Sequence, residues 1–270
     1  EVDSIVEVVR CFDDPNIVHV DGNINPKRDI ETINLELIFA DIETVDKKID
    51  SAKKKLKADK KYAAELELFE KIKSILEEGK SARTLSLNEE EQELLKDTYL
   101  LTMKPILYIA NVSEEQLSNP FEDEYVKKVV EYAKTENAEV IPLCVKIEEE
   151  LASLDGEDKK EMLDAMGLQE SGLDKVIKAC YDLLGLMSFL TAGESEARAW
   201  TIKKGTKAPV AAGKIHSDIE RGFIRAEIVS YNDLIREGSM TAAKEKGLVR
   251  SEGKDYIMQE GDIVLFRFNV

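Results

Sequence analysis

Cysteine is rare in this chain, and its placement excludes a disulfide framework. Cys11, Cys144 and Cys180 are odd in number, far apart and without a CxxC pair. This pattern predicts neither disulfides nor a zinc site and favours the reducing cytoplasm. Long apolar runs are also missing, since the longest, Ile106–Ala110 and Leu183–Leu190, fall far below the roughly 18 residues of a membrane span. We therefore expect no association with a membrane.

Basic residues are outnumbered by acidic ones. The 270 residues include 38 Lys and Arg against 55 Asp and Glu, which gives a formal net charge of −17. This surplus argues against general binding of nucleic acids or of anionic membranes by the protein surface as a whole, and we expect no DNA partner. Residues 187–270 carry 13 basic and 12 acidic side chains, whereas residues 1–186 carry 25 and 43. Charge is therefore segregated along the chain.

An initiating methionine is absent as well. The chain begins at Glu1, directly before the strand-like segment Ser4–Val9, and we expect it to start inside a domain. Turn-forming residues, Arg10–Pro15, follow that segment. At about 150 residues per domain, the length predicts roughly two domains.

The apolar residues between Ile38 and Leu76 predict a pair of helices. The first stripe has the alternating spacing of a coiled coil and comprises Ile38, Ile42, Val45, Ile49, Ala52 and Leu56. The second comprises Tyr62, Leu66, Phe69, Ile72 and Leu76 and ends near Gly79. Asn88 and Glu91 resemble a capping box that opens a further helix. We expect an antiparallel helical hairpin, inserted as a unit at residues 38–102.

Two short apolar runs with a helical stretch between them predict a βαβ unit. Residues 104–110 and 138–145 form the runs, and residues 122–134 form the helix. Such units bind ligands at the carboxyl ends of their strands, which places residues 111–114 and 144–146 at one rim. From about residue 187 the pattern changes to short alternating segments between glycine turns, which predicts a separate small domain.

Several strings of the sequence resemble known proteins. Gly213–Phe223 (GKIHSDIERGF), preceded by Trp200–Pro209 (WTIKKGTKAP), resembles a TGS domain, which is a β-grasp module. Together with Arg10–Pro15 (RCFDDP), residues 23–34 (NINPKRDIETIN), the loop Asn111–Glu114 (NVSE) and the ending FRFNV, these strings resemble the YchF (Obg-like ATPase) family of P-loop proteins. The resemblance covers essentially the whole chain.

The resemblance implies an α/β fold in which a partial P-loop NTPase (G-domain) parallel sheet carries an inserted α-helical coiled-coil hairpin and is followed by a β-grasp TGS domain. The implied domains are residues 1–37, 38–102, 103–186 and 187–270. The implied protein is cytoplasmic, associates with the ribosome and its rRNA, and in full-length form binds ATP, or GTP, with Mg2+ and hydrolyses it.

Two departures from the family pattern bear on activity. The phosphate-binding motif GxxxxGK[ST] occurs nowhere in the sequence, and its backbone cradle and lysine have no substitute here. We therefore expect this chain alone to bind no nucleotide tightly, to be inactive, and to contain no catalytic or metal-binding residue. The smaller departure is Glu7, which stands where the family more often has histidine.

The resemblance also assigns a site for the nucleotide base. Its residues come from two loops and are Asn111, Val112, Glu114, Cys144, Val145 and Lys146. GTPases read guanine with NKxD, whereas NVSE has a longer carboxylate and no lysine. Guanine specificity should therefore weaken, in line with a family that prefers or tolerates ATP. Taken alone, an NxxE pattern more simply caps a turn after a strand.

Residues 197–225 hold a local surplus of positive charge, for which phosphate contact with RNA is the functional interpretation. The basic residues are Arg198, Lys203, Lys204, Lys207, Lys214, Arg221 and Arg225, against Asp218 and Glu220. TGS domains are associated with RNA and ribosome binding, and Trp200 or Phe223 could offer a stacking face. The simpler interpretations are a solvated strand edge and aromatic core residues.

Two further features are interpreted as structural. His216 titrates near neutrality but has no nucleophile arrangement beside it, so a structural hydrogen bond is favoured. The acidic run Glu148–Glu150 is interpreted as a solvated helix start rather than a metal site. Two alternatives to a nucleotide hydrolase stay open: an RNA- or ribosome-binding adaptor that acts through the basic TGS face without catalysis, and a structural interaction protein built on the hairpin.

Overall fold

The structure is a computed structural model that describes residues 2–18, 22–193 and 196–269. The chain divides into two compact units, Glu1–Cys180 and Tyr181–Val270. Helix α7 (Gly172–Leu183) contains the boundary between them. None of the described helices is both long and apolar enough to cross a membrane. Glu1 and Val270, which end the outermost predicted domains, lie outside the described residues.

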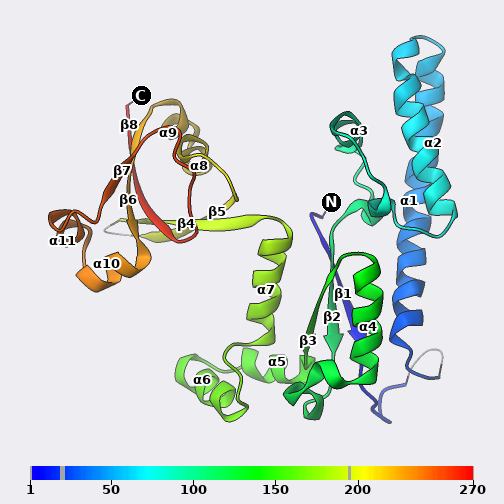
Figure 1. Cartoon of the computed structure of the whole chain (residues 1–270), viewed down its shortest axis with the longest axis horizontal. Coiled ribbons are helices and arrows are strands. Elements are labelled where there is room, and N and C mark those ends of the chain that lie inside the picture. The colour runs from blue at the N-terminus through cyan, green and yellow to red at the C-terminus, as the bar shows by residue number, and fades with distance from the viewer. Residues whose placement is uncertain (1, 19–21, 194–195, 270) are drawn as a thin grey trace. The chain divides into compact units, whose positions relative to one another are not determined.

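A parallel sheet forms the centre of the first unit (Figure 1). Its three strands, in spatial order, are β1 (Ile5–Arg10), β2 (Ile106–Asn111) and β3 (Glu139–Leu143). Arg10 pairs with Asn111, and Asn111 with Leu143, so all three strands end at the same edge. Helix α4 (Glu124–Thr135) connects β2 to β3 and packs Val126 and Val129 against the sheet. The predicted βαβ unit and its parallel sheet are confirmed.

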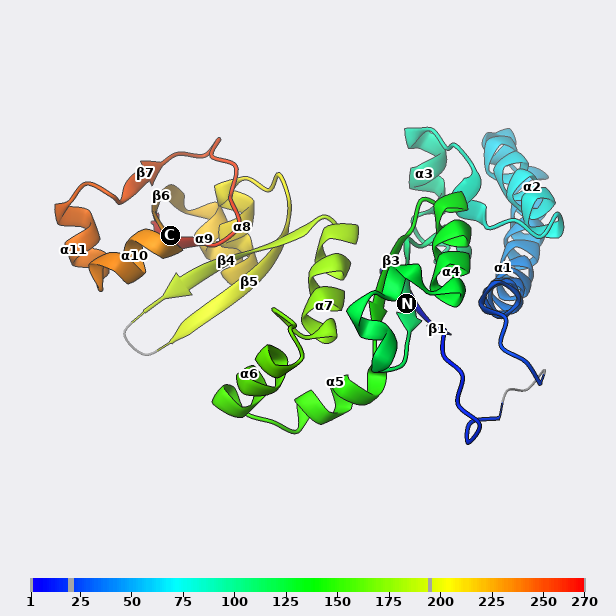
Figure 2. The same cartoon turned by 60° about the horizontal axis from the view of Figure 1, so that its bottom comes forward.

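Two long helices, α1 (Pro26–Leu56) and α2 (Ala63–Glu77), lie side by side (Figures 1 and 2). Ion pairs between Asp46 and Lys73 and between Lys53 and Glu70 show that they run antiparallel. Their apolar stripes form one buried cluster around Val45, Phe69 and Ile72. Helix α1 begins at Pro26, which is before residue 38, where the sequence predicts the inserted unit to start. The boundaries of the predicted domains stay predictions.

The middle of α1 is joined to the segment that leads into β2. Asp41, which is only 2% exposed, accepts hydrogen bonds from the backbone N–H of Leu101 (2.8 Å) and of Thr102 (2.7 Å). It also accepts one from the Thr102 hydroxyl at 2.7 Å. That hydroxyl in turn accepts from the Ala82 N–H at 3.1 Å, which fixes the chain after α2. Helix α3 (Glu89–Leu95) follows, and the predicted capping box of Asn88 and Glu91 is present.

A cluster of polar side chains is buried between β1, β2, α1 and α4. Glu7 of β1 is 8% exposed, and its Oε2 atom accepts no hydrogen bond from the described residues. Glu136 accepts a hydrogen bond from the Tyr108 hydroxyl at 2.6 Å and lies 3.5 Å from the Arg83 guanidinium. Burial, followed by the nearby Glu136 carboxylate, raises the pKa of Glu7 to about 7, and Arg83 offsets part of this rise. Glu7 is therefore protonated in part near neutral pH.

After β3 the chain forms three helices, of which the last begins against the first. They are α5 (Val145–Ala152), α6 (Gly156–Ala165) and α7. The Glu148 carboxylate accepts hydrogen bonds from the N–H groups of Gly172 (2.7 Å) and Leu173 (2.9 Å) and so caps the start of α7. A Cβ at Gly172 would lie 2.8 Å from both Glu148 and Leu143, so this close approach requires glycine. The interpretation of Glu148 as a merely solvated residue is therefore wrong.

The second unit is a five-stranded mixed sheet in the spatial order β5-β4-β8-β6-β7. The strands are β4 (Leu186–Ala192), β5 (Ala197–Lys203), β6 (Phe223–Ser230), β7 (Arg250–Glu252) and β8 (Asp262–Phe268). Helices α8 (Ala208–Ile215) and α9 (Ser217–Arg221) contribute side chains to one buried cluster, which also contains Phe189 and Phe266. Helices α10 (Tyr231–Glu237) and α11 (Met240–Glu245) accompany a second, around Val229.

Candidate functional site

The loops that leave the three parallel strands surround one cavity of about 940 Å³. Its lining comes from residues 12–17 after β1, residues 111–115 after β2 and residues 144–149 after β3. Because carboxyl ends of parallel strands are where α/β folds bind ligands, this cavity is the natural candidate site. All six residues of the predicted base site line it: Asn111, Val112, Glu114, Cys144, Val145 and Lys146.

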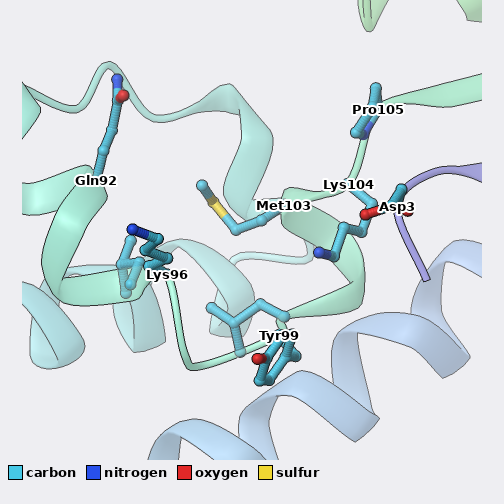
Figure 3. A pocket seen from close by; sticks show the side chains of 9 residues that line it. Asp3, Gln92, Lys96, Tyr99, Met103, Lys104 and Pro105 are labelled. Carbon is cyan, nitrogen blue, oxygen red and sulfur yellow. The ribbon is translucent and has the colours of Figure 1, made fainter. Parts of the chain in front are cut away.

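A smaller cavity of about 290 Å³ lies near the opposite end of the strands, where β1 and β2 begin (Figure 3). Asp3 and Pro105, which precede these strands, contribute to its wall. Lys104 places its ammonium 5.8 Å from the centre of the Tyr99 ring. Since the amino ends of parallel strands lack the convergent loops of the carboxyl ends, we do not take this cavity as the functional site.

Asn111 holds the edge of the sheet together. Its Oδ1 atom accepts a hydrogen bond from the Val145 N–H at 3.1 Å, which links the end of β2 to the start of α5. Its backbone carbonyl accepts from the Cys11 N–H at 2.8 Å. No described residue accepts a hydrogen bond from the Asn111 Nδ2 group, and Asn111 is one of the residues that line the cavity. The turn-capping and the ligand-binding interpretations of Asn111 are therefore compatible.

Val112 and Cys144 are nearly fully buried, at 1% and 5% exposure. Both residues, backbone atoms included, are therefore almost entirely enclosed by the rest of the protein. The Val112 N–H donates to the Leu143 carbonyl at 2.9 Å, which ties the loop after β2 to β3. Beneath the loops, burial raises the pKa of the Cys11 thiol to about 12, so this cysteine is not a nucleophile.

The loop after β1 forms a wall of the cavity that the sequence did not assign to the site. The Arg10 guanidinium donates hydrogen bonds to the carbonyls of Phe12 (3.0 Å), Asp14 (3.3 Å) and Ile17 (3.0 Å). It also lies 5.0 Å from the centre of the Phe12 ring. One basic side chain thus shapes the whole loop. The rule that ligands bind where parallel strands end would have identified this loop as a third part of the rim.

Gln116 is a second residue that the sequence did not single out. Its Oε1 accepts from the Ser113 N–H at 2.6 Å, and its Nε2 donates to the Cys11 carbonyl at 3.0 Å and to the Asp123 carboxylate at 2.6 Å. Gln116 therefore joins the loops after β1 and β2 and aligns both with the start of α4. No motif in the sequence marks this role.

The charge of the lining limits what the cavity can hold. Five carboxylates contribute to it, from Asp13, Asp14, Glu114, Glu115 and Glu149, against the single ammonium of Lys146. An acidic rim repels phosphate groups but accepts hydrogen bonds from amines, ring N–H groups and hydroxyls. The geometry thus suits a heterocyclic base or a sugar, with any phosphate placed elsewhere.

The seven basic residues predicted to contact RNA are all exposed, but most have an acidic or aromatic neighbour. Lys204 pairs with Asp182, Lys207 with Asp255, Arg221 with Asp218 and Arg225 with Glu227, and Arg198 lies over the Trp200 ring. For Lys203 and Lys214 the described residues offer no ion-pair partner. A count of charges within residues 197–225 misses three of these carboxylates. Asp182 and Asp255 belong to distant segments, and Glu227 lies just after residue 225.

The structure also places the other residues considered for a site in this unit. Phe223 is 5% exposed and belongs to the core, so the idea that it stacks on a base is wrong. Trp200 is half-buried and donates from Nε1 to the Thr191 hydroxyl at 2.9 Å. His216 ends α8, and its Nδ1 accepts a hydrogen bond from the Asp218 N–H at 3.2 Å at the start of α9. The structural interpretation of His216 is confirmed.

Comparisons with known proteins bear on both units. The family model YchF-GTPase_C, described as "Protein of unknown function (DUF933)", matches residues 186–269. The chain is 56% identical to a "Ribosome-binding ATPase YchF" of Bacillus subtilis and 47% identical to one of Haemophilus influenzae, in each case over 100% of this chain and 74% of the relative. The solved structure of the Schizosaccharomyces pombe YchF GTPase matches with a TM-score of 0.82 and 35% identity, over 98% of this chain and 72% of that one.

Proposed function

Since the chain belongs to the YchF family, we propose that its cavity at the carboxyl edge of the parallel sheet binds the base of ATP, or of GTP, in a ribosome-binding ATPase. The observation that carries the proposal is Asn111, which lines the cavity, has its Oδ1 fixed by the Val145 N–H, and has no partner for its Nδ2 among the described residues. A side-chain amide can donate to N7 of a purine. We propose further that backbone atoms near Val112 contact adenine, which favours ATP over GTP.

The proposal for this chain is limited to recognition of the base. The sequence has no GxxxxGK[ST] motif, and within the described ranges no cluster of three or more His, Cys, Asp or Glu side chains could hold a metal ion. The residues present do not fit a Mg2+-bound triphosphate, so we derive no catalytic step from them. Hydrolysis with Mg2+ is proposed for the full-length form, in the cytoplasm, where ribosomes are found.

Base recognition can be tested with adenosine, which has no phosphates. We expect Asn111→Ala to weaken adenosine binding by about 1 to 3 kcal/mol, because an amide donor to the base is lost. Asn111→Asp should weaken it similarly, although Asp retains an oxygen for the Val145 N–H. Binding is measured by NMR titration of the labelled protein. Asn119→Ala, the same change outside the cavity lining, is the matched control. Equal affinity for adenosine in the unaltered protein, the two Asn111 variants and this control would refute the assignment.

We further propose that residues 38–102 act as the inserted hairpin of the family and that the second unit acts as its TGS domain, with the seven basic residues on its ribosome-facing side. The ion pairs of the structure indicate which of these residues should contribute most to RNA binding. Lys203 has no ion-pair partner among the described residues, whereas Lys204 lies 2.6 Å from the Asp182 carboxylate. The unpaired lysine has more charge to offer an RNA phosphate.

Lys203→Gln is therefore expected to weaken ribosome binding several-fold at physiological salt, and Lys204→Gln to weaken it less. The reason is that Lys204 must first give up its ion pair with Asp182. Co-sedimentation with ribosomes over a range of salt concentrations gives both affinities. A larger effect at Lys204 than at Lys203 would contradict this ranking.

A further inference from the structure

The connection between α1 and α2 concentrates positive charge in an otherwise acidic chain. Residues 47–61, here called the basic tip, contain eight lysines and two aspartates, a net charge of +6 where the whole chain has −17. All but one of the lysines are exposed, and Lys48 is half-buried. The candidate nucleotide site does not use any of them.

Only part of this charge is neutralised nearby. Lys53 pairs with Glu70 at 3.4 Å, Lys55 with Glu65 at 3.5 Å and Lys61 with Asp59 at 3.1 Å. In the part of the chain that the structure describes, the other five lysines form no ion pair: Lys47, Lys48, Lys54, Lys57 and Lys60. Lysines in the last turn of a helix are favoured by its dipole, but this does not account for Lys47, Lys48 or Lys60.

The basic tip stands away from the rest of the first unit. Asp41 is the point where α1 is tied to the turn before β2. From there to Leu56 the helix rises about 22 Å, at about 1.5 Å per residue. Figure 1 shows the connection between α1 and α2 at the end of the pair far from the sheet. Lysines at this end can therefore contact a partner molecule that does not touch the sheet.

The kind of partner follows from what accompanies the charge. Within the described residues, no large apolar side chain between Phe39 and Leu94 is exposed. Tyr62 is half-buried beneath the ammonium groups of Lys55 and Lys61. A protein interface needs aromatic or apolar anchors, and a membrane-binding segment needs apolar residues to insert. The basic tip offers neither, so its surface suits phosphate groups.

We infer that the basic tip binds the phosphate backbone of folded RNA and forms a second RNA-binding surface besides the second unit. Lysine presents a compact point charge and lacks the bidentate fork of arginine, so these lysines position the protein without reading sequence. In a ribosome-binding protein the partner is ribosomal RNA, and in that respect the inference rests on the proposed function.

The test replaces three unpaired lysines of the tip together, Lys54→Gln, Lys57→Gln and Lys60→Gln. The control replaces Lys134, Lys160 and Lys175 by Gln; these are exposed lysines of the first unit outside the tip, so the change in net charge is the same. Circular dichroism checks that each protein folds. Binding to ribosomes and to a naked RNA hairpin is measured at several salt concentrations.

The tip variant is expected to bind both probes at least tenfold more weakly than the control. The logarithm of its binding constant should fall less steeply with the logarithm of the salt concentration. The slope should be smaller by about 0.9 for each RNA phosphate that the tip no longer neutralises. Equal binding by the tip and control variants would overturn the inference while the proposed function stands. Weaker binding to ribosomes but not to naked RNA would assign the tip to a ribosomal protein and also overturn it. If the unaltered protein binds no ribosomes, the proposed function itself fails.

Discussion

Replacing Asp41 by alanine is expected to lower the free energy of unfolding of the first unit by about 3 to 5 kcal/mol. The carboxylate accepts three hydrogen bonds, from Leu101 and Thr102. Alanine strands two backbone N–H groups, and Thr102 is fully buried, so water cannot replace the missing acceptor. The Thr102 hydroxyl also loses its orientation toward the Ala82 N–H. One substitution thereby detaches α1 from the segment that leads into β2.

The two units allow a clean measurement of this effect. Trp200 is the only tryptophan and lies in the second unit, whereas most of the helix lies in the first. Circular dichroism during urea unfolding should show an earlier transition in Asp41→Ala, while the fluorescence of Trp200 should report an unchanged midpoint. Glu43→Ala, an exposed acid on the same helix, is the control and should change stability by less than about 0.5 kcal/mol. A similar loss in both variants would rule out the proposed tie.

Glu7 is expected to make the first unit less stable as the pH rises. Its pKa in the folded protein is about 7, against an ordinary value of 4.5. Between these values the folded state binds more protons than the unfolded state, so the free energy of unfolding falls as the pH increases. The loss begins near pH 4.5 and is complete above pH 7, where it amounts to at most about 3 kcal/mol.

Glu7→Gln removes the titrating group and keeps its size. The variant should match the original protein near pH 4.5 and exceed it in free energy of unfolding at pH 8. The difference between the two unfolding curves therefore reports the effect of a titratable group at position 7. Glu139→Gln, an exposed residue of the same sheet, should show no such difference. A gap between Glu7→Gln and the original protein that is constant from pH 4.5 to 8 would mean that Glu7 does not titrate in this range.

The apolar pattern predicted most of the first unit, and its failures have physical causes. The predicted apolar stripe begins at Ile38, whereas α1 begins at Pro26, because Asn34 interrupts the buried face between Ile30 and Ile38. In the structure Asn34 is buried and donates to the Tyr132 hydroxyl at 3.0 Å, a partner almost a hundred residues away in sequence. Likewise, nothing local marks Glu7 as buried, because its environment is made by Arg83 and Glu136.

The parts of the candidate site that lie in short contiguous segments could be predicted from the sequence. The NVSE loop and residues 144–146 follow strands, and the structure brings them to one cavity. Arg10 and Gln116 were not predicted, because their roles consist of hydrogen bonds to loops that meet only in the folded sheet. Whether the cavity binds a base remains a prediction for the Asn111 variants to decide.

The strand order of the second unit has a consequence for how that unit folds. Its central strand, β8, is the last in sequence and separates the β5–β4 pair from the β6–β7 pair. Neither pair can join the other until β8 is in place, and the pairing of β4 with β8 closes a loop of some seventy residues. Pairings so distant in sequence slow the search for the native state. During synthesis this unit should therefore acquire its fold only after β8 has left the ribosomal exit tunnel.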